Sequence, residues 1–395
     1  MKPSTARELL STCTLSGLHA MAVSMSAPLI PLQVVRLGVD PGVLGVLLSL
    51  AAFGALAAAL PTGYVVRRLG TRLPLVASAL VTALVCVYLF SAPALSGLIA
   101  GLLLFGVCRT VFAVSIQSHV GGLELGTDVS ANFGWYGMGV SGGQIAGPLV
   151  AGLVIDRFGL GPAWLIMAGI GAALAAGVPL TMGPGSVVQE RPEVAPSRRL
   201  SLKDIVSWGT LIGVIASFTT VFALGVRESF YPVYLKGLGY PAAVTGAMMS
   251  ARGIVSLLSR FSLGPLVRMA RERFNLLCLC MAALALAIGT TFLCRTIPLL
   301  VVNSIMVGAS FGLAIPLTQA MVFGSVPAAE RGIAMGMRMT ANRLAQFTGP
   351  ILFGLVTQAG GISAAFSVGG SLMLLITGIL FVAWSRLSGR GRTAR

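Results

Sequence analysis

Long apolar runs recur along the whole chain, and short polar breaks separate them. Crossing a bilayer as a helix takes about 20 mostly apolar residues, and these runs reach that length. Because polar and apolar residues do not alternate within them, they predict helices rather than barrel strands. The runs cover approximately residues 11–33, 42–66, 74–91, 96–118, 130–154, 162–182, 207–230, 241–263, 275–293, 298–322, 334–358 and 363–385.

The composition argues against a water-soluble surface around these helices. Of the 395 residues, 56% are hydrophobic and only 10% are charged, whereas soluble domains carry about 25% charged residues. We therefore predict an all-α integral membrane protein with 12 transmembrane helices. The first run follows Lys2 and Arg7 as the core of a signal peptide would. It continues through Pro28 and Pro31 to Val35 without a clear cleavage site, so we interpret it as a membrane helix.

Basic residues gather on one side of this predicted topology. With the N-terminus inside, the outer loops hold only Arg36, Arg157, Lys236 and Arg295. The inner loops and tails hold a much larger set, namely Lys2, Arg7, Arg67, Arg68, Arg72, Arg191, Arg198, Arg199, Lys203, Arg268, Arg271, Arg273, Arg331, Arg386, Arg390, Arg392 and Arg395. The positive-inside rule then predicts a multi-pass protein of the cell (inner) membrane with both termini in the cytoplasm. We attribute the net charge of +16 to this topology and to contact with the lipid bilayer, not to nucleic acid.

One phrase occurs twice in the chain. GQIAGPLVAGL begins at Gly143 and AQFTGPILFGL begins at Ala345, so Gln144 and Gln346 lie 202 positions apart. Further matches, at an offset of 201, are Pro31 with Pro232, Gly38 with Gly239, Gly45 with Gly246, Ser49 with Ser250 and Gly63 with Gly264. Internal duplication is typical of secondary transporters. We predict two pseudo-symmetric six-helix halves, 1–183 and 205–395, joined by a polar cytoplasmic linker at 184–204.

The duplicated phrase spaces small residues four apart and then places a proline. Gly139, Gly143 and Gly147 share one helix face, so a neighbouring helix is expected to approach them closely, and Pro148 is expected to bend the helix. The second copy keeps this pattern with Ala341, Ala345, Gly349 and Pro350. Ordinary packing of small residues is the alternative, but the duplication favours a mechanical role.

These features together resemble the major facilitator superfamily over the whole chain. Gly134, Gly143, Gly147-Pro148 and Ala151-Gly152 resemble the fifth-helix motif of its antiporters, with Ala151 where the motif usually has Gly. GYVVRRLGTR from Gly63 resembles the loop between the second and third helices, Arg109 lies where drug exporters often carry Arg, and APLIP from Ala27 resembles the proline pair of the first helix. The resemblance implies two halves that rock about a central site lined by the first, fourth, seventh and tenth helices. The residues it implicates in gating are Gly63, Arg68, Gly70, Arg72, Gly143, Gly147, Pro148, Gly349 and Pro350.

Two positions depart from the family pattern. The loop motif normally has an acid at the position of Arg67, where the family's carboxylate faces the start of the eleventh helix. Some antiporters carry an acid at the position of Ala22, six residues before the first proline. The usual gating ion pair and that proton site therefore do not carry over.

Arginine is unusually frequent inside the predicted helices, where a buried charge is costly and often marks a pathway. Arg260 and Arg338 lie near helix ends and are expected to extend toward the membrane surface. The deeper polar residues give a candidate substrate site of Arg109, Asn132, Tyr136, Gln144, Asn342, Arg343 and Gln346. This set would suit an anionic substrate because guanidinium groups bind carboxylates and phosphates. Alternatively, the arginines only brace the bundle.

Coupling to protons requires a group that titrates. We predict His19 or Glu228, and the acids Glu124 and Asp128 are further candidates. A packing role for His19, and an ion pair between Glu228 and the adjacent Arg227, are the structural alternatives.

The chain carries few features of an enzyme. It has two His, no paired carboxylates at helical spacing, no phosphate-binding loop and no metal-ligand cluster, so we expect no enzymatic activity, no metal and no cofactor. We predict a monomeric secondary active transporter that exports a drug or a small metabolite, anionic metabolites included, in exchange for protons. The alternative is an importer of an organic anion, by symport or facilitated exchange.

Overall fold

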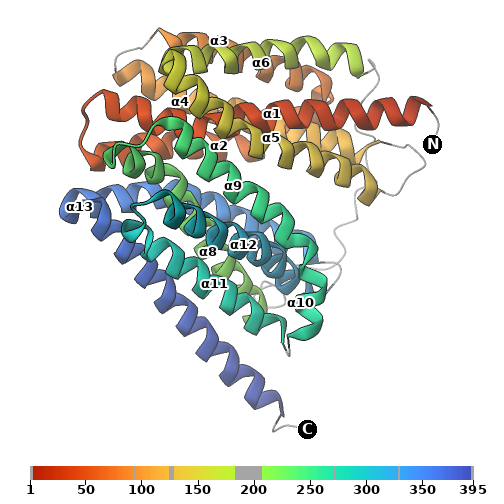
Figure 1. The fold of residues 1–395 in the computed structure, drawn as a ribbon. Helices are drawn as coiled ribbons and strands as arrows, with labels where there is room; N and C mark the ends of the chain where they lie inside the picture. The colour runs from red at the N-terminus through yellow and green to blue at the C-terminus, as the bar shows by residue number, and fades with distance from the viewer. Residues whose placement is uncertain are drawn as a thin grey trace. The chain divides into compact units, whose positions relative to one another are not determined.

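The computed structural model describes residues 3–91, 95–123, 129–182, 207–270, 272–327 and 330–392. Helices dominate these residues (Figure 1). They are α1 (Pro3–Arg36), α2 (Pro41–Leu69), α3 (Arg72–Phe90), α4 (Leu95–Gly121), α5 (Val129–Phe158), α6 (Leu160–Thr181), α8 (Trp208–Gly237), α9 (Ala242–Phe261), α10 (Leu263–Met269), α11 (Arg273–Gly289), the 3₁₀ turn η1 (Thr291–Leu293), α12 (Ile297–Gly324) and α13 (Arg331–Arg392).

Each of the twelve predicted segments coincides with a helix of the structure. Ten helices of the described chain are long and apolar enough to cross a membrane, or eleven if the bent pair of α10 and α11 counts as one span. The last two predicted segments both lie in α13, which is interrupted by the non-helical Gly361 (φ 80°, ψ 168°). The predicted linker 184–204 lies outside the described residues, as do Glu124 and Asp128.

Two glycines at equivalent positions of the repeat end equivalent helices. Gly38 follows α1 with a φ of 68°, and Gly239 follows α8 with a φ of 83°. A side chain rarely adopts this left-handed conformation, so glycine at both positions lets the chain turn directly into α2 and α9. The duplication in the sequence therefore extends to the local backbone.

The chain divides into two compact units. Unit 1 comprises residues 1–39, 46–197 and 231–250, and unit 2 comprises 40–45, 198–230 and 251–395. The boundaries follow the sequence repeat except at two short segments, 40–45 and 231–250. Each of these contains the start of a helix, α2 or α9, that packs with the unit of the other repeat.

The core of unit 1 is formed by apolar faces of α1, α3, α4 and α6. Leu15, Leu75, Phe112 and Leu174 are buried against one another there. Unit 1 also contains a pair of polar side chains, in which the indole N–H of Trp164 donates a hydrogen bond to Oε1 of Gln33. Pairing of this kind is expected for a polar group with little access to water.

In unit 2, aromatic rings link α8 to both parts of α13. The ring of Phe353 lies 4.7 Å from that of Phe230 and 5.0 Å from that of Phe366, measured between centroids. At the C-terminal end of α12, Val322 and Val326 pack on Ala334 of α13. Packing of α11 and α12 against α13 completes the unit.

Candidate functional site

The glycine face of α5 lies directly on α1 in unit 1. A Cβ on Gly143 would collide with the carbonyl oxygen of Gly17, and one on Gly147 would meet the backbone and the Ser24 hydroxyl. The Ser24 hydroxyl also donates to the Gly143 carbonyl at 3.0 Å. The close approach predicted for this face is therefore present, with α1 as the partner helix.

Beyond Pro148, the same helix contacts the start of α9. A Cβ on Gly246 would collide with the Pro148 carbonyl, and Gly152 lies against the backbone of Ala242 and Ala243. Asp156 then accepts two hydrogen bonds, from the Ala242 N–H at 2.8 Å and from the Ala243 N–H at 2.7 Å. Asp156 was not among the residues predicted from the sequence. The signal that could have identified it is an acid shortly after the end of the duplicated phrase.

Unit 2 contains the corresponding arrangement. Pro350 of α13 presents its carbonyl to Gly45 at the start of α2, and Gly354 approaches the Pro41 carbonyl and Gly45. Gln358 lies 202 positions after Asp156, and its side-chain oxygen packs against Gly42. Beyond the proline, the two copies of the phrase thus build equivalent contacts, one in each unit.

His19 and Arg109 meet in the interior of unit 1. They line a cavity of about 10 Å³ together with Thr82 and Phe112, which is room for roughly one water molecule. The His19 ring stacks on Phe112 with centroids 4.3 Å apart. This geometry places a candidate proton acceptor beside a candidate substrate ligand.

The other candidates in unit 1 are dispersed along α5. Asn132 is buried and donates to the Leu123 carbonyl just beyond α4 at 3.2 Å. The Tyr136 hydroxyl accepts from the Gln117 amide at 3.3 Å. Gln144 is exposed on the surface of the structure. These three side chains do not form one cluster, and their predicted role in substrate binding stays a prediction.

Glu228 in unit 2 forms an ion pair with Arg252, whereas the alternative raised from the sequence was an ion pair with the neighbouring Arg227. A guanidinium nitrogen of Arg252 lies 2.7 Å from Oε1 of Glu228, with 12% and 33% of the two side chains exposed. Arg227 instead points into the unit, is fully buried, and donates to Ser304 at 3.0 Å and Asn303 at 3.4 Å. Adjacent helical residues point about 100° apart, which explains the separate partners.

Arg338 is buried, so the expectation that it extends to the membrane surface is wrong. Its guanidinium donates to the Ser217 hydroxyl at 3.1 Å, and that hydroxyl donates to Oδ1 of Asn342 at 2.8 Å. Arg343 donates to Gln346 on the next turn at 3.2 Å. The polar residues of α13 thus divide into a chain bound to α8, formed by Arg338 and Asn342, and a local pair of Arg343 and Gln346. Arg260, by contrast, is exposed.

Three of the predicted gating residues, Arg68, Gly70 and Arg72, lie at or beside the turn between α2 and α3. Gly70 has a φ of 73°, and Arg72 donates to the Pro179 carbonyl at 3.2 Å. Arg67 and Arg68 are exposed beside the Tyr64 ring, 5.8 Å and 5.1 Å from its centre. A cation therefore occupies the position where the family pattern has an acid.

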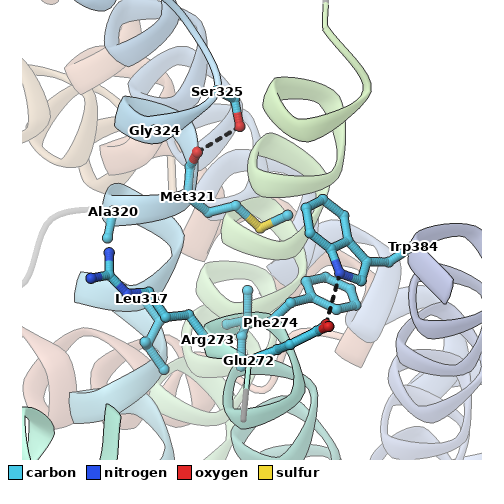
Figure 2. Close-up of a pocket in the computed structure, with 10 residues that line it drawn as sticks. Glu272, Arg273, Phe274, Leu317, Ala320, Met321, Gly324, Ser325 and Trp384 are labelled. Atoms are coloured by element: carbon cyan, nitrogen blue, oxygen red, sulfur yellow. Dashed lines mark hydrogen bonds between the residues drawn. The ribbon is translucent and has the colours of Figure 1, made fainter. Parts of the chain in front are cut away.

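A separate pocket of about 370 Å³ lies at one end of α11, α12 and α13 (Figure 2). Its wall includes Phe274 and Trp384, whose rings stack at 4.8 Å. The Trp384 N–H points to the Glu272 carboxylate at 3.4 Å, while Arg273 extends along the opposite side. None of the predicted site residues lines this pocket.

The comparison with protein families settles the relationship of the chain. The Major Facilitator Superfamily model matches residues 12–293 and again residues 268–394. The chain belongs to this superfamily. It is accordingly a multi-pass membrane protein of the transporter class, as the resemblance of its motifs predicted.

Relatives within the superfamily include resistance proteins. The chain is 28% identical over 393 residues to "Multidrug resistance protein MdtG" of Salmonella choleraesuis, covering 92% of the chain and 91% of the relative. It is 26% identical over 360 residues to "Tetracycline resistance protein, class C" of Escherichia coli, covering 87% and 88%.

Solved structures of transporters share the fold. The nucleoside transporter NupG superposes with a TM-score of 0.80 at 16% identity, covering 95% of this chain and 99% of that one. A bacterial homologue of the human lysosomal transporter Spinster, inward-facing and unoccupied, gives 0.75 at 13% identity, covering 97% and 96%. At these identities the likeness concerns the fold alone.

Proposed function

We propose that this protein exports drug-like small molecules across the cell (inner) membrane in exchange for protons. The observation that carries the proposal is its similarity to multidrug and tetracycline resistance proteins over most of both chains. The fifth-helix phrase, which resembles that of antiporters, supports the same direction of transport. The halves 1–183 and 205–395 would alternate access as a monomer, with both termini in the cytoplasm.

The Glu228–Arg252 pair is the best-supported candidate for proton coupling. Glu228 is partly exposed, so a proton can reach it, and its partner Arg252 lies 2.7 Å away. Protonation would remove the negative charge and release Arg252, which changes the interactions between α8 and α9. Coupling a charge change to helix contacts in this way is what a proton-driven conformational cycle requires.

His19 is the second candidate, for a different reason. It shares its cavity with Arg109, so a proton on the imidazole would face a fixed positive charge. Movement of Arg109 toward an anionic substrate would relieve that repulsion. His19 would therefore couple protonation to substrate binding, whereas Glu228 would couple it to a helix contact.

The test is transport by the purified full-length protein in liposomes with an imposed pH gradient. The panel should include tetracycline, lipophilic cations and organic anions such as carboxylates. We expect the liposomes to accumulate a cation or tetracycline while protons move in the opposite direction. This accumulation should be abolished when the pH gradient is collapsed. Accumulation of a carboxylate along with protons would instead establish the importer alternative.

Matched variants separate the coupling residues from general damage. We expect Glu228→Gln to keep substrate binding but lose the response to the pH gradient, and Arg260→Gln, on the exposed face of α9, to retain it. His19→Ala tests the second candidate in the same assay. An unchanged response in both Glu228→Gln and His19→Ala would refute the assignment of the coupling residues.

A further inference from the structure

The residue before α9 differs from the residue before α2 in its side chain. Asp40 precedes α2 and Pro241 precedes α9, and the carbonyl of each accepts a hydrogen bond from the first turn, from the Leu44 N–H at 2.9 Å and from the Val244 N–H at 3.1 Å. Aspartate is among the side chains that best cap the first N–H groups of a helix. At the equivalent position of the repeat, α9 is preceded by Pro241, whose side chain accepts no hydrogen bond.

Asp156 supplies the missing cap from another helix. Its two carboxylate oxygens accept the first two N–H groups of α9 at 2.8 Å and 2.7 Å. These N–H groups have no partner within their own helix, and the positive end of the helix dipole favours an anion there. Pro241 is 85 positions from Asp156 in the chain, so this cap exists only while α5 and α9 are in contact.

The equivalent contact in unit 2 has no charge. Gln358 occupies the position of Asp156 and packs against Gly42 at the start of α2, and the residue before this helix is Asp40. Both contacts lie at the ends that the charge distribution predicts to be outside, near the outer cations Arg36 and Arg157. On the opposite side, Arg67 stands where the family pattern has an acid.

We propose that Asp156 is a positioning residue of the outer gate, which holds the transporter closed to the outside by capping α9 across the repeat boundary. Opening the outer side separates α5 from α9 and breaks both hydrogen bonds, so the cap stabilises the outward-closed state only. With Arg67 in place of the acid of the inner loop, the equilibrium is biased toward this state. The proposal rests on alternating access as proposed above.

The first experiment is hydrogen exchange of the intact protein in nanodiscs, read by mass spectrometry. Asp156→Asn keeps the size of the side chain but replaces one acceptor oxygen by an NH₂ group, which cannot accept. Loss of a helix cap changes an equilibrium by about five- to tenfold. We expect exchange to increase by about that factor at the start of α9, and to increase as well at residues 40–48 of α2, because both outer contacts open together.

The response of α2 distinguishes a gate from a local cap. If Asp156 only stabilises the end of α9, exchange rises at 238–250 and stays unchanged at 40–48, and the proposal is wrong. Unchanged exchange at both places would overturn it equally. Asp40→Asn is the matched control, since it removes a charge from a helix start on the same side without removing a contact between repeats, and we expect it to leave exchange at 238–250 unaltered.

A second variant moves the equilibrium in the opposite direction. Gln358→Glu places a carboxylate beside the start of α2, so we expect slower exchange at both 40–48 and 238–250. Transport by the same preparations separates the two proposals. Exchange that shifts as expected in a protein that moves none of the panel would leave the gate intact and refute drug export, whereas proton-driven export with unshifted exchange would refute the gate.

Discussion

The small residues before the proline have the same spacing in both copies of the duplicated phrase, but they build different helix contacts. In the first copy, Gly143 and Gly147 lie against the backbone of α1 so closely that a Cβ would collide with main-chain atoms. In the second copy, a Cβ on Gly349 would meet the side chains of Val226 and Phe222 at 3.4 to 3.6 Å, an ordinary contact distance. The α1–α5 pair is therefore a rigid backbone contact, and the α8–α13 pair is separated by side chains.

The extra space in the second copy is used for polar groups. Arg338 and Asn342 of α13 reach Ser217 of α8, whereas the equivalent Ser16 of α1 contacts α5 through the Tyr136 carbonyl, at 3.4 Å. Functional side chains require room between helices, and small residues remove that room. The difference indicates that the first half provides a rigid contact between helix backbones, whereas the second half provides polar contacts that can adjust.

The largest effect that separates the halves is expected at Arg227. This residue is fully buried and hydrogen-bonded to α12, while the equivalent position in the first half is Ser26, which bonds locally to the Val23 carbonyl at 2.6 Å. We expect Arg227→Ala to reduce the free energy of unfolding by roughly 3 kcal/mol, through a cavity and lost hydrogen bonds. Ser26→Ala should cost under about 1 kcal/mol. Thermal unfolding in detergent measures both, and equal losses would contradict the comparison.

An intermediate effect is expected from alanine in the two equivalent glycine positions. Gly147→Ala forces α1 and α5 apart and should destabilise the protein by about 2 kcal/mol. Gly349→Ala fits between side chains and gains helix propensity, so its net effect should stay within about 1 kcal/mol of zero. The melting temperatures of the two variants, measured side by side, test this directly. A larger loss for Gly349→Ala would reverse the assignment of the rigid contact.

The smallest effect is expected at the two equivalent serines. Ser217→Ala removes the hydroxyl that joins Arg338 to Asn342 and should cost about 1–2 kcal/mol. Ser16→Ala loses one weak inter-helix bond and should cost about 0.5 kcal/mol. A double-mutant cycle of Ser217→Ala with Asn342→Ala measures the interaction energy between the Ser217 hydroxyl and the Asn342 amide. A value near zero would mean that the two groups act independently, which would contradict the prediction.

Much of the fold could be predicted from the sequence because a bilayer leaves few choices. Within lipid, backbone groups must pair inside the segment, so each run of about 20 apolar residues becomes a helix. The predicted segments agree with the helices of the structure, including the two that meet at Gly361. The glycine spacing on 130–154 likewise predicted a close helix contact, since Gly139, Gly143 and Gly147 recur with a helical period.

The candidate site was predicted less well because a side chain's partner depends on direction as well as on sequence position. Glu228 and Arg227 are adjacent in the chain, yet Glu228 pairs with Arg252 and Arg227 with Ser304. Arg338 lies near a helix end but is buried on Ser217. Contacts that join distant helices leave no periodic signal in a single sequence.

The sequence by itself determined that this chain is a helical membrane protein with an internal repeat, because hydrophobic length and duplicated spacing are local properties. The identity of each charged partner was decided only by the tertiary structure. Asp156 is the clearest case: the sequence shows an acid after an apolar helix and a proline before another, 85 positions apart. Only the packing of α5 against α9 brings that carboxylate to the N–H groups that Pro241 leaves uncapped.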